Sequence, residues 1–127
     1  MGTEMREYLK IDVLLGKTLA AVENKGDEII LRTTDGEVYR QYHSQDCCES
    51  VTVEEIVGDL SDLIGSPILQ AEEVEGGAEV APAPEYAESF TWTFYKLATI
   101  KGGVTIRWLG QSNGYYSESV DFVKDAA

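Results

Sequence analysis

The first third of the chain alternates short apolar segments with turn-forming residues. Residues 17–23 and 28–34 have the β-branched and apolar content of strands, and Asn-Lys-Gly-Asp at 24–27 separates them. The Asp-Gly pair at 35–36 then precedes a third such segment, 37–42, and supplies the positive φ that a two-residue hairpin turn requires. These patterns predict a three-stranded antiparallel meander.

Residues 51–65 have the features of a helix in two pieces. Thr52 as N-cap and Glu55 three residues later form a capping box. Gly58 interrupts the segment, because glycine destabilises a helix interior, and Asp59 or Ser61 can cap the second piece. We therefore expect one broken, two-piece helix after the first meander.

The second half of the chain predicts another strand at 68–74 and a second meander at 90–101, 104–109 and 115–122. Together these segments predict an α+β fold: a mostly antiparallel sheet of about six strands from two meanders, with the broken helix between them. We expect one domain over residues 1–127.

Residues 75–88 are acidic and rich in Gly, Pro and Ala. This composition is typical of a mobile surface loop, and the alternative is a lid or an arm that contacts another subunit.

The turn at residues 101–103 permits two registers in the second meander. If its first two residues form the loop, Lys96 lies opposite Arg107, and directly opposed like charges destabilise a sheet. If the two glycines form the loop, Ala98 lies opposite Arg107, and Gly-Gly suits a type I′ turn. We predict the second register.

In this register the side chains alternate between two faces. One face forms a credible core: Tyr95, Leu97, Val104, Ile106 and Trp108. The other face combines three aromatic rings with two cations: Phe90, Trp92, Phe94, Lys96 and Arg107. That second face is either an apolar layer covered by the helix or another subunit, or a platform that stacks a planar base and pairs a cation with phosphate.

The chain has 23 acidic and 10 basic residues, for a net charge of −13. Because this charge repels a polyanion, duplex DNA is not an expected partner. No Lys or Arg occurs between Arg40 and Lys96, whereas acidic residues recur from Asp46 to Glu88. Such a region is most simply a solvated face that keeps the protein soluble, or a surface that mimics DNA or binds a basic protein.

Hydrophobic residues make up 43% and charged residues 26% of the chain, as in globular proteins. Apolar runs are too short to cross a bilayer, and the N-terminus lacks the order of a signal peptide. We expect a cytoplasmic protein that does not enter membranes.

The segment around His43 and the adjacent Cys47 and Cys48 is the first candidate for chemistry. A zinc site needs about four such ligands, and Asp46 and Glu49 disfavour the thiolate that a cysteine nucleophile needs. We expect no metal, no cofactor and no enzymatic activity, and we expect the cysteines to be small buried hydrophobes.

The second candidate is the segment from Arg107 to Ser117, which gathers a guanidinium, an amide, hydroxyls and two phenols around a turn. These groups are equally consistent with a plain hairpin and with a site for a polar aromatic ligand that carries phosphates. With the aromatic face, they predict the ligand-binding residues Phe90, Trp92, Lys96, Arg107, Ser112, Asn113, Tyr115 and Tyr116.

Several motifs are distinctive in combination: Tyr-His-Ser-Gln-Asp-Cys-Cys-Glu-Ser at 42–50, Gly-Asp-Leu-Ser-Asp-Leu-Ile-Gly at 58–65, Thr-Trp-Thr-Phe-Tyr at 91–95 and Ser-Asn-Gly-Tyr-Tyr-Ser at 112–117. Over residues 14–122 the chain resembles a family of small phage-encoded proteins of unknown function. The layout of strands and short helices also resembles the phage anti-Thoeris sponge proteins.

The sponge proteins are taken to bind cyclic ADP-ribose-type signals, and some cyclic oligonucleotides, without cleaving them, in pockets shared between subunits. The resemblance implies a non-catalytic homo-oligomer in the cytoplasm of an infected bacterial host, where it counteracts antiphage defence. It implies ligand contacts at Phe90, Trp92, Arg107 and Asn113. The alternative function is an acidic phage inhibitor or DNA mimic that binds a basic host protein.

Overall fold

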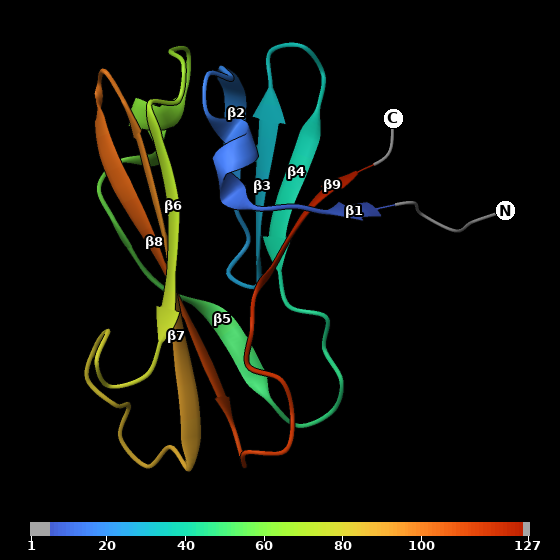
Figure 1. Ribbon diagram of the computed structural model, residues 1–127, viewed down its shortest axis with the longest axis vertical. Coiled ribbons are helices and arrows are strands. Elements are labelled where there is room, and N and C mark those ends of the chain that lie inside the picture. The colour runs from blue at the N-terminus through green and yellow to red at the C-terminus, as the bar shows by residue number, and fades with distance from the viewer. Residues whose placement is uncertain (1–5, 126–127) are drawn as a thin grey trace, which may run out of the picture.

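Two antiparallel β-sheets face each other in the computed structural model, which describes residues 6–125 (Figure 1). The five-stranded sheet has the order β1-β9-β4-β3-β2 and the four-stranded sheet the order β5-β8-β7-β6. The strands are β1 Arg6–Tyr8, β2 Leu19–Asn24, β3 Glu28–Thr33, β4 Val38–Tyr42, β5 Ser50–Val57, β6 Gln70–Gly76, β7 Ser89–Thr99, β8 Gly102–Ser112 and β9 Asp121–Asp125. Two one-turn 3₁₀ helices complete the fold, η1 Ile11–Leu14 and η2 Leu60–Leu63.

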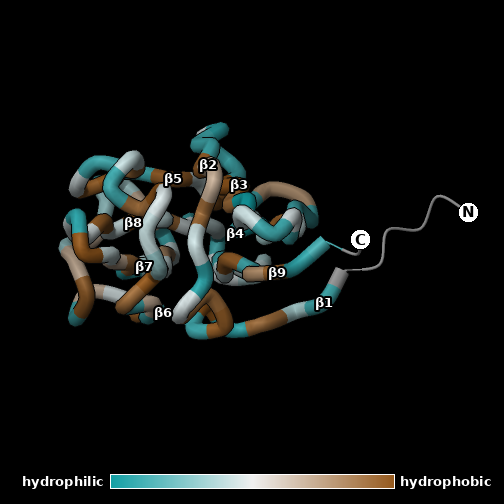
Figure 2. The backbone as a smooth tube through the Cα atoms, turned by 90° about the horizontal axis from the view of Figure 1, so that it is seen from above, coloured by the Kyte–Doolittle hydropathy of each residue, from teal (hydrophilic) through white to brown (hydrophobic). Residues whose placement is uncertain are grey.

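The hydrophobic core fills the space between the two sheets. In the view from above, the strands of the two sheets lie on opposite sides of this space (Figure 2). Each sheet contributes every second residue to the core, as strand alternation requires. The five-stranded sheet contributes Leu19, Ile29, Leu31, Tyr39 and Phe122. The four-stranded sheet contributes Val51, Ala71, Tyr95, Leu97, Val104, Ile106 and Trp108.

The predicted α+β class is wrong, because the segment expected to form the broken helix is mainly a strand. Residues 50–57 form β5, which pairs antiparallel with β8 at the edge of the four-stranded sheet. The valines, threonine and isoleucine of this segment suit a strand, and pairing with β8 outweighs the local capping signal. Asp59 does cap a second piece, since its Oδ1 accepts the Ser61 N–H at 2.9 Å, but that piece is only the 3₁₀ turn η2.

The first predicted meander is confirmed as β2-β3-β4, whereas the second meander is wrong in its last strand. The chain after β8 crosses to the other sheet, where β9 pairs with β4 and β1. The ring of Phe122 on β9 stacks on that of Tyr39 with centroids 5.6 Å apart, which anchors the strand in the core. The free side of β8 is taken by β5 instead.

The predicted register of the β7–β8 hairpin is also wrong, by four residues, because Arg107 lies opposite Phe94 and not opposite Ala98. Thr99 lies opposite Gly102, so Ile100 and Lys101 form the loop. Contacts with η2 set this turn: the Thr99 hydroxyl donates to the Asp62 carbonyl, and Lys101 Nζ donates to the Ile64 carbonyl at 2.6 Å. A shift of four residues, like any even number, leaves every side chain on its predicted face, so the division into a core face and an aromatic face is correct.

Candidate functional site

The outer face of the four-stranded sheet holds the aromatic and cationic residues singled out in the sequence. Arg107 on β8 lies directly opposite Phe94 on β7. Its guanidinium carbon is 4.8 Å from the centroid of the Phe94 ring and 5.1 Å from that of Trp92. These are cation–π distances, so the rings orient the arginine on the sheet.

Arg107 also pairs with Glu55 on β5, its cross-strand neighbour on the other side. The arginine side chain is 26% exposed and the glutamate 53% exposed, so solvent reaches this ion pair. An exposed pair of this kind contributes little to stability, about 0–1 kcal/mol. The buried Nε of Arg107 has no hydrogen-bond partner, so the guanidinium is not fully used by the fold.

The acidic segment between β6 and β7 folds back over part of the aromatic face. Trp92 is buried, and its indole Nε1 donates to the Pro82 carbonyl at 3.1 Å. A small apolar cluster surrounds the indole: Ala81 and Leu109, with Val80, Phe90 and Phe94 packed against it. Of the two sequence-based interpretations, a covering layer therefore describes Trp92, while Phe90 and Phe94 stay partly exposed.

Lys96 is the second cation of this face. It lies two residues along β7 from Phe94, partly buried, with Thr105 on β8 and Glu72 on β6 as its cross-strand neighbours. The opposition of Lys96 and Arg107 that guided the register prediction does not arise. The two cations lie instead on adjacent rows of the same face.

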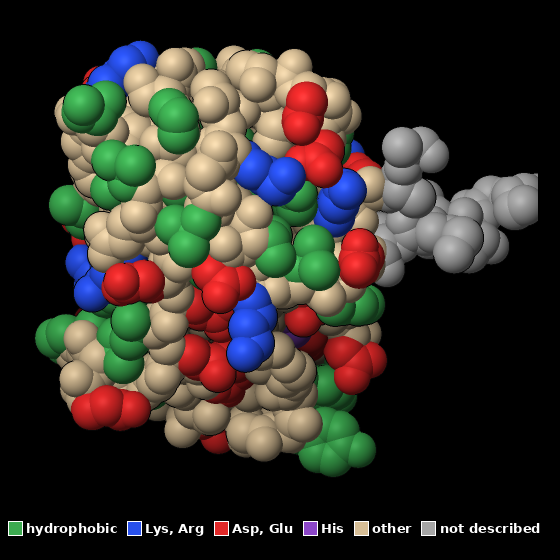
Figure 3. Space-filling view, turned by 45° about the horizontal axis from the view of Figure 1, so that its top comes forward, with side chains coloured by type: hydrophobic (Ala, Val, Ile, Leu, Met, Phe, Trp, Pro, Cys, Tyr) green, Lys and Arg blue, Asp and Glu red, His purple; other side chains and the backbone are tan. Residues whose placement is uncertain are grey.

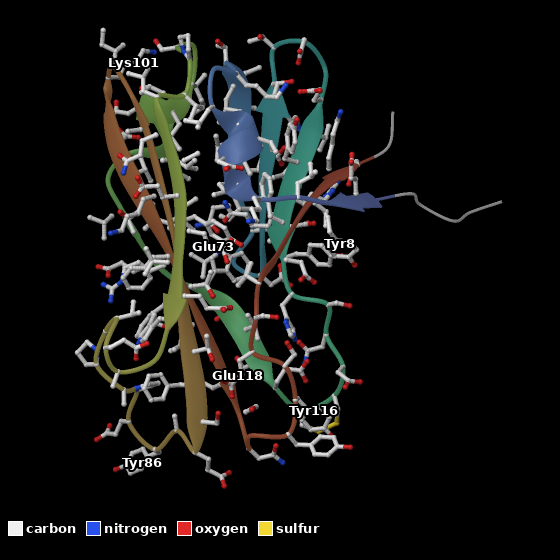
Figure 4. All side chains as sticks on the ribbon, in the orientation of Figure 1. Tyr8, Glu73, Tyr86, Lys101, Tyr116 and Glu118 are labelled. Atoms are coloured by element: carbon white, nitrogen blue, oxygen red, sulfur yellow. A yellow bond between two sulfur atoms is a disulfide. The ribbon has the colours of Figure 1, made fainter. Side chains whose placement is uncertain are left out.

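The other predicted residues lie at the far end of the hairpin, in the segment that leads from β8 to β9. Figure 4 shows Tyr116 and Glu118 at this end and Lys101 at the opposite one. Asn113 accepts the Tyr115 N–H at 2.9 Å, as in an Asx turn, and the Tyr115 and Tyr116 rings meet edge to face with centroids 5.0 Å apart. The eight predicted residues thus form two groups: four on the outer face (Phe90, Trp92, Lys96 and Arg107) and four at the far end of the hairpin (Ser112, Asn113, Tyr115 and Tyr116).

Glu118 is a residue that the sequence interpretation missed. Its carboxylate accepts the hydroxyls of Ser112 and Thr91, and a Cβ on Gly110 would lie 2.4 Å from its carbonyl. Burial opposes ionisation, but hydrogen bonds from the hydroxyls of Ser112, Ser89 and Thr91 lower the pKa of Glu118. Ser112 is therefore already engaged with an anion. The backbone of Glu118 packs closely against Gly110, and this contact, which the sequence does not reveal, places the carboxylate beside these hydroxyls.

A buried His–Glu pair lies at the start of β5. His43 Nδ1 donates to the Ser119 carbonyl at 2.7 Å, and Nε2 lies 2.6 Å from Glu49 Oε2. The hydrogen bond with His43, with the backbone N–H groups of Cys47 and Asp46, lowers the pKa of Glu49 to about 2. The His43 ring thus lies between a carbonyl oxygen and a carboxylate oxygen, and it links the β8–β9 segment to the start of β5.

The two cysteines are not the small buried hydrophobes that the sequence predicted. Cys47 and Cys48 are exposed and joined to each other by a disulfide. An extended chain would point them apart, but the backbone bends at this pair and lets the sulfurs meet. No group of three His, Cys, Asp or Glu side chains within residues 6–125 is placed to hold a metal ion.

Polar residues also point into the space between the sheets, which the sequence interpretation assigned to the core alone. Glu73 on β6 lies opposite Tyr95 on β7, and Glu75 lies opposite Thr93. Figure 4 shows Glu73 directed from β6 toward the five-stranded sheet. The alternation in this strand is inverted, because the apolar Val74 faces outward and is 36% exposed.

Comparison with known proteins supplies a family and no function. Among the described residues, no helix has the length and apolar character needed to cross a bilayer. No curated protein and no solved structure matches the chain. The model of DUF7448, a domain of unknown function, matches residues 12–122. The chain therefore belongs to the DUF7448 family.

Proposed function

We propose that this protein is a non-catalytic phage sponge that binds a cyclic nucleotide signal, of the cyclic ADP-ribose type or a cyclic oligonucleotide, and withholds it from host defence. The observation that supports this is the position of Arg107 on the rings of Trp92 and Phe94. A guanidinium held over aromatic rings remains able to pair its N–H groups with a phosphate, and a planar base can stack beside it.

Glu55 is the group that such a ligand displaces. A phosphate that pairs with Arg107 replaces one anion by another, so the cation keeps a partner throughout. The exchange is inexpensive because the Arg107–Glu55 pair is open to solvent. Phe94 is the partly exposed ring opposite Arg107, Phe90 is a second partly exposed ring four residues away on β7, and Lys96 supplies the second cation.

Assembly into a homo-oligomer is part of this proposal. A single subunit carries a net charge of −13, so its overall field repels a phosphate-bearing ligand. A second copy laid over the outer face would cover the exposed Val74 beside Phe94 and would add cations to the site. The turn residues Asn113, Tyr115 and Tyr116 lie too far along the hairpin to share a ligand with Arg107 of the same subunit. In the proposed oligomer, a second copy supplies these turn residues to the ligand instead.

The test is the melting temperature of the purified protein with cyclic ADP-ribose isomers and cyclic oligonucleotides. We expect one of these ligands to raise the melting temperature of the wild type and to be recovered uncleaved after denaturation. The same ligand should leave the melting temperature of Arg107→Ala unchanged. Arg32→Ala is the control, because Arg32 also pairs with a partly exposed glutamate, Glu23 at 3.0 Å, but lies on the other sheet. The proposal is contradicted if no ligand raises the melting temperature, or if the ligand raises it equally in Arg107→Ala. Recovery of a cleaved ligand would show that the protein is an enzyme.

A second candidate, an acidic inhibitor or DNA mimic that binds a basic host protein, is favoured by the placement of the acidic residues. The region without Lys or Arg supplies β5 and β6, which are the two edges of the four-stranded sheet. Charged edges also prevent strand-to-strand aggregation, which is the structural reason to have them. A complex with a basic host protein that dissociates as salt is raised supports this candidate, and a monodisperse protein that retains no partner at low salt contradicts it.

A further inference from the structure

The disulfide between Cys47 and Cys48 lies in the loop that joins β4 to β5. Because the two residues are adjacent in the chain, the bond closes almost no loop and removes little conformational freedom from the unfolded protein. It also ties no distant segments together. General stabilisation of the fold therefore does not account for this bond, and its effect on the structure is local.

The disulfide belongs to a loop that is folded around the buried carboxylate of Glu49. Oε1 of this carboxylate accepts the Cys47 N–H at 2.9 Å, and Oε2 accepts the Asp46 N–H at 2.8 Å. The Gln45 side chain also joins the loop, since its Nε2 donates to the Glu49 carbonyl at 2.7 Å. A backbone N–H of the disulfide itself thus takes part in holding Glu49.

Glu49 connects this loop to the segment between β8 and β9. Its Oε2 lies 2.6 Å from His43 Nε2, and His43 Nδ1 lies 2.7 Å from the Ser119 carbonyl oxygen. Figure 4 shows the disulfide at the same end of the molecule as Tyr116, which belongs to that segment. A change at the disulfide therefore has a hydrogen-bonded route, through Glu49 and His43, to the segment that carries the exposed tyrosines.

The two sulfur atoms are open to reagents in solution, because both cysteines are exposed. Exposed disulfides exchange with thiols more readily than the structural disulfides of protein interiors do. Acidic side chains gather on the face seen in Figure 3, in keeping with the net charge of −13, so the field of the protein repels an anionic thiol. A neutral dithiol is therefore the best-matched reductant.

We propose that Cys47–Cys48 is a reversible thiol–disulfide exchange site, whose reduction releases the loop from Glu49 and loosens the contact between His43 and Ser119. One thiolate of a dithiol attacks a cysteine sulfur, the S–S bond breaks, and the displaced cysteine takes up a proton. The second thiolate of the dithiol then attacks its partner's sulfur in the mixed disulfide and releases the other cysteine as a thiol. The cysteines gain two electrons and two protons, which the dithiol loses as it becomes a disulfide, and oxidised glutathione reverses the exchange.

Reduction weakens the loop because it restores backbone freedom at the two cysteines. In the oxidised form the bond restricts both residues while the Cys47 N–H is directed at Glu49. Without the bond, keeping that N–H in place costs more conformational entropy. The hydrogen bonds around Glu49 then open more often, and the link to Ser119 opens with them.

Counting thiols tests the exchange itself. The folded protein is equilibrated with oxidised glutathione or with dithiothreitol, and its free thiols are then blocked with iodoacetamide in denaturant and counted by mass spectrometry. We expect no alkylated or glutathionylated cysteine in the oxidised sample and two alkylated cysteines after reduction. Free thiols or bound glutathione in the oxidised sample would overturn the proposal.

Hydrogen exchange in the two redox forms tests the effect on structure. We expect residues 44–49 to exchange about fivefold faster after reduction and residues 113–119 to exchange faster as well, while β3 is unchanged. Cys47→Ser/Cys48→Ser is the control: it should show the fast exchange of the reduced form with and without dithiothreitol. Equal exchange in the two forms of the wild type, or a response of the control to dithiothreitol, would overturn the proposal. The measurement uses no nucleotide, so its outcome is independent of the site proposed at Arg107.

Discussion

The indole Nε1 of Trp108 donates a hydrogen bond to Gln41 Oε1 at 3.1 Å, which links the two sheets through the middle of the core. Both side chains are 0% exposed. Gln41→Met keeps the approximate shape but leaves the indole N–H unpaired, and an unsatisfied buried donor costs about 1–3 kcal/mol. Urea unfolding should therefore show this loss for Gln41→Met and almost none for the exposed Gln70→Met. An unchanged midpoint for Gln41→Met would mean that the bond contributes nothing.

The Glu49–His43 pair makes stability depend on acid pH. The pKa of Glu49 in the folded protein is about 2, below the ordinary glutamate pKa of 4.5. A lowered carboxyl pKa gives a contribution that is complete above 4.5 and is lost as the pH falls toward 2. Glu49→Gln should therefore be less stable than the wild type at neutral pH, and the difference should shrink through this window.

Chemical unfolding at a series of pH values measures that difference. Glu54→Gln, at an exposed position of β5, is the control and should follow the wild type. A constant gap between wild type and Glu49→Gln at all pH values would contradict the charged pair. Glu37 adds to the acid sensitivity of both proteins, because hydrogen bonds from Lys17 and Lys124 lower its pKa to about 2.

Gly58 is required where β5 meets the β7–β8 turn. Its φ is +108°, and a Cβ there would lie 2.6 Å from the Gly103 carbonyl oxygen. Gly58→Ala should cost about 2 kcal/mol or more, from a left-handed backbone plus a forced displacement of β8. Gly16→Ala is the control, because Gly16 has φ +83° and nothing within 4 Å of the added Cβ, so it should cost about 1 kcal/mol. Equal losses of stability for Gly58→Ala and Gly16→Ala in thermal unfolding would contradict the close approach of Gly58 to Gly103.

The hydrogen bond from Trp92 to Pro82 should hold the segment between β6 and β7 against the outer face. Trp92→Phe removes this bond, worth ~1 kcal/mol, and should raise the open fraction of the segment about fivefold. Cleavage at Glu79 or Glu85 by a glutamate-specific protease, followed by mass spectrometry, measures the opening. Tyr86→Phe, at a residue that is 93% exposed, should be cleaved at the wild-type rate. Equal rates for all three proteins would support the mobile loop predicted from composition.

The predicted strands that matched the structure are those whose signal is local. Alternating apolar residues and a turn at each end indicate β3 and β4, and both lie within two residues of their predicted bounds. Alternation also placed Arg107 on the same face as Trp92 and Phe94, since a register error of four residues does not move a side chain to the other face.

The errors arose where distant segments compete with local preference. A capping sequence favoured a helix at residues 51–65, yet the open edge of β8 offered that segment a full set of backbone hydrogen bonds. Contacts of Thr99 and Lys101 with the chain around η2 outweighed the preference of Gly-Gly for a tight turn. Glu118 and the Tyr95–Glu73 pair were not recognised, because only the packing of separate strands brings these side chains to their neighbours.

From its sequence alone, this chain is an acidic protein rich in antiparallel strands, with an aromatic and cationic face opposite an apolar one. Composition, turn residues and the twofold period of a strand determine these features, because each depends on neighbours along the chain. The tertiary structure decided that the strands divide into two sheets, that β9 crosses between them, and that Glu73 and Glu75 turn inward opposite Tyr95 and Thr93. Those outcomes depend on which strand edges and apolar faces meet, and residues far apart in the sequence determine that meeting.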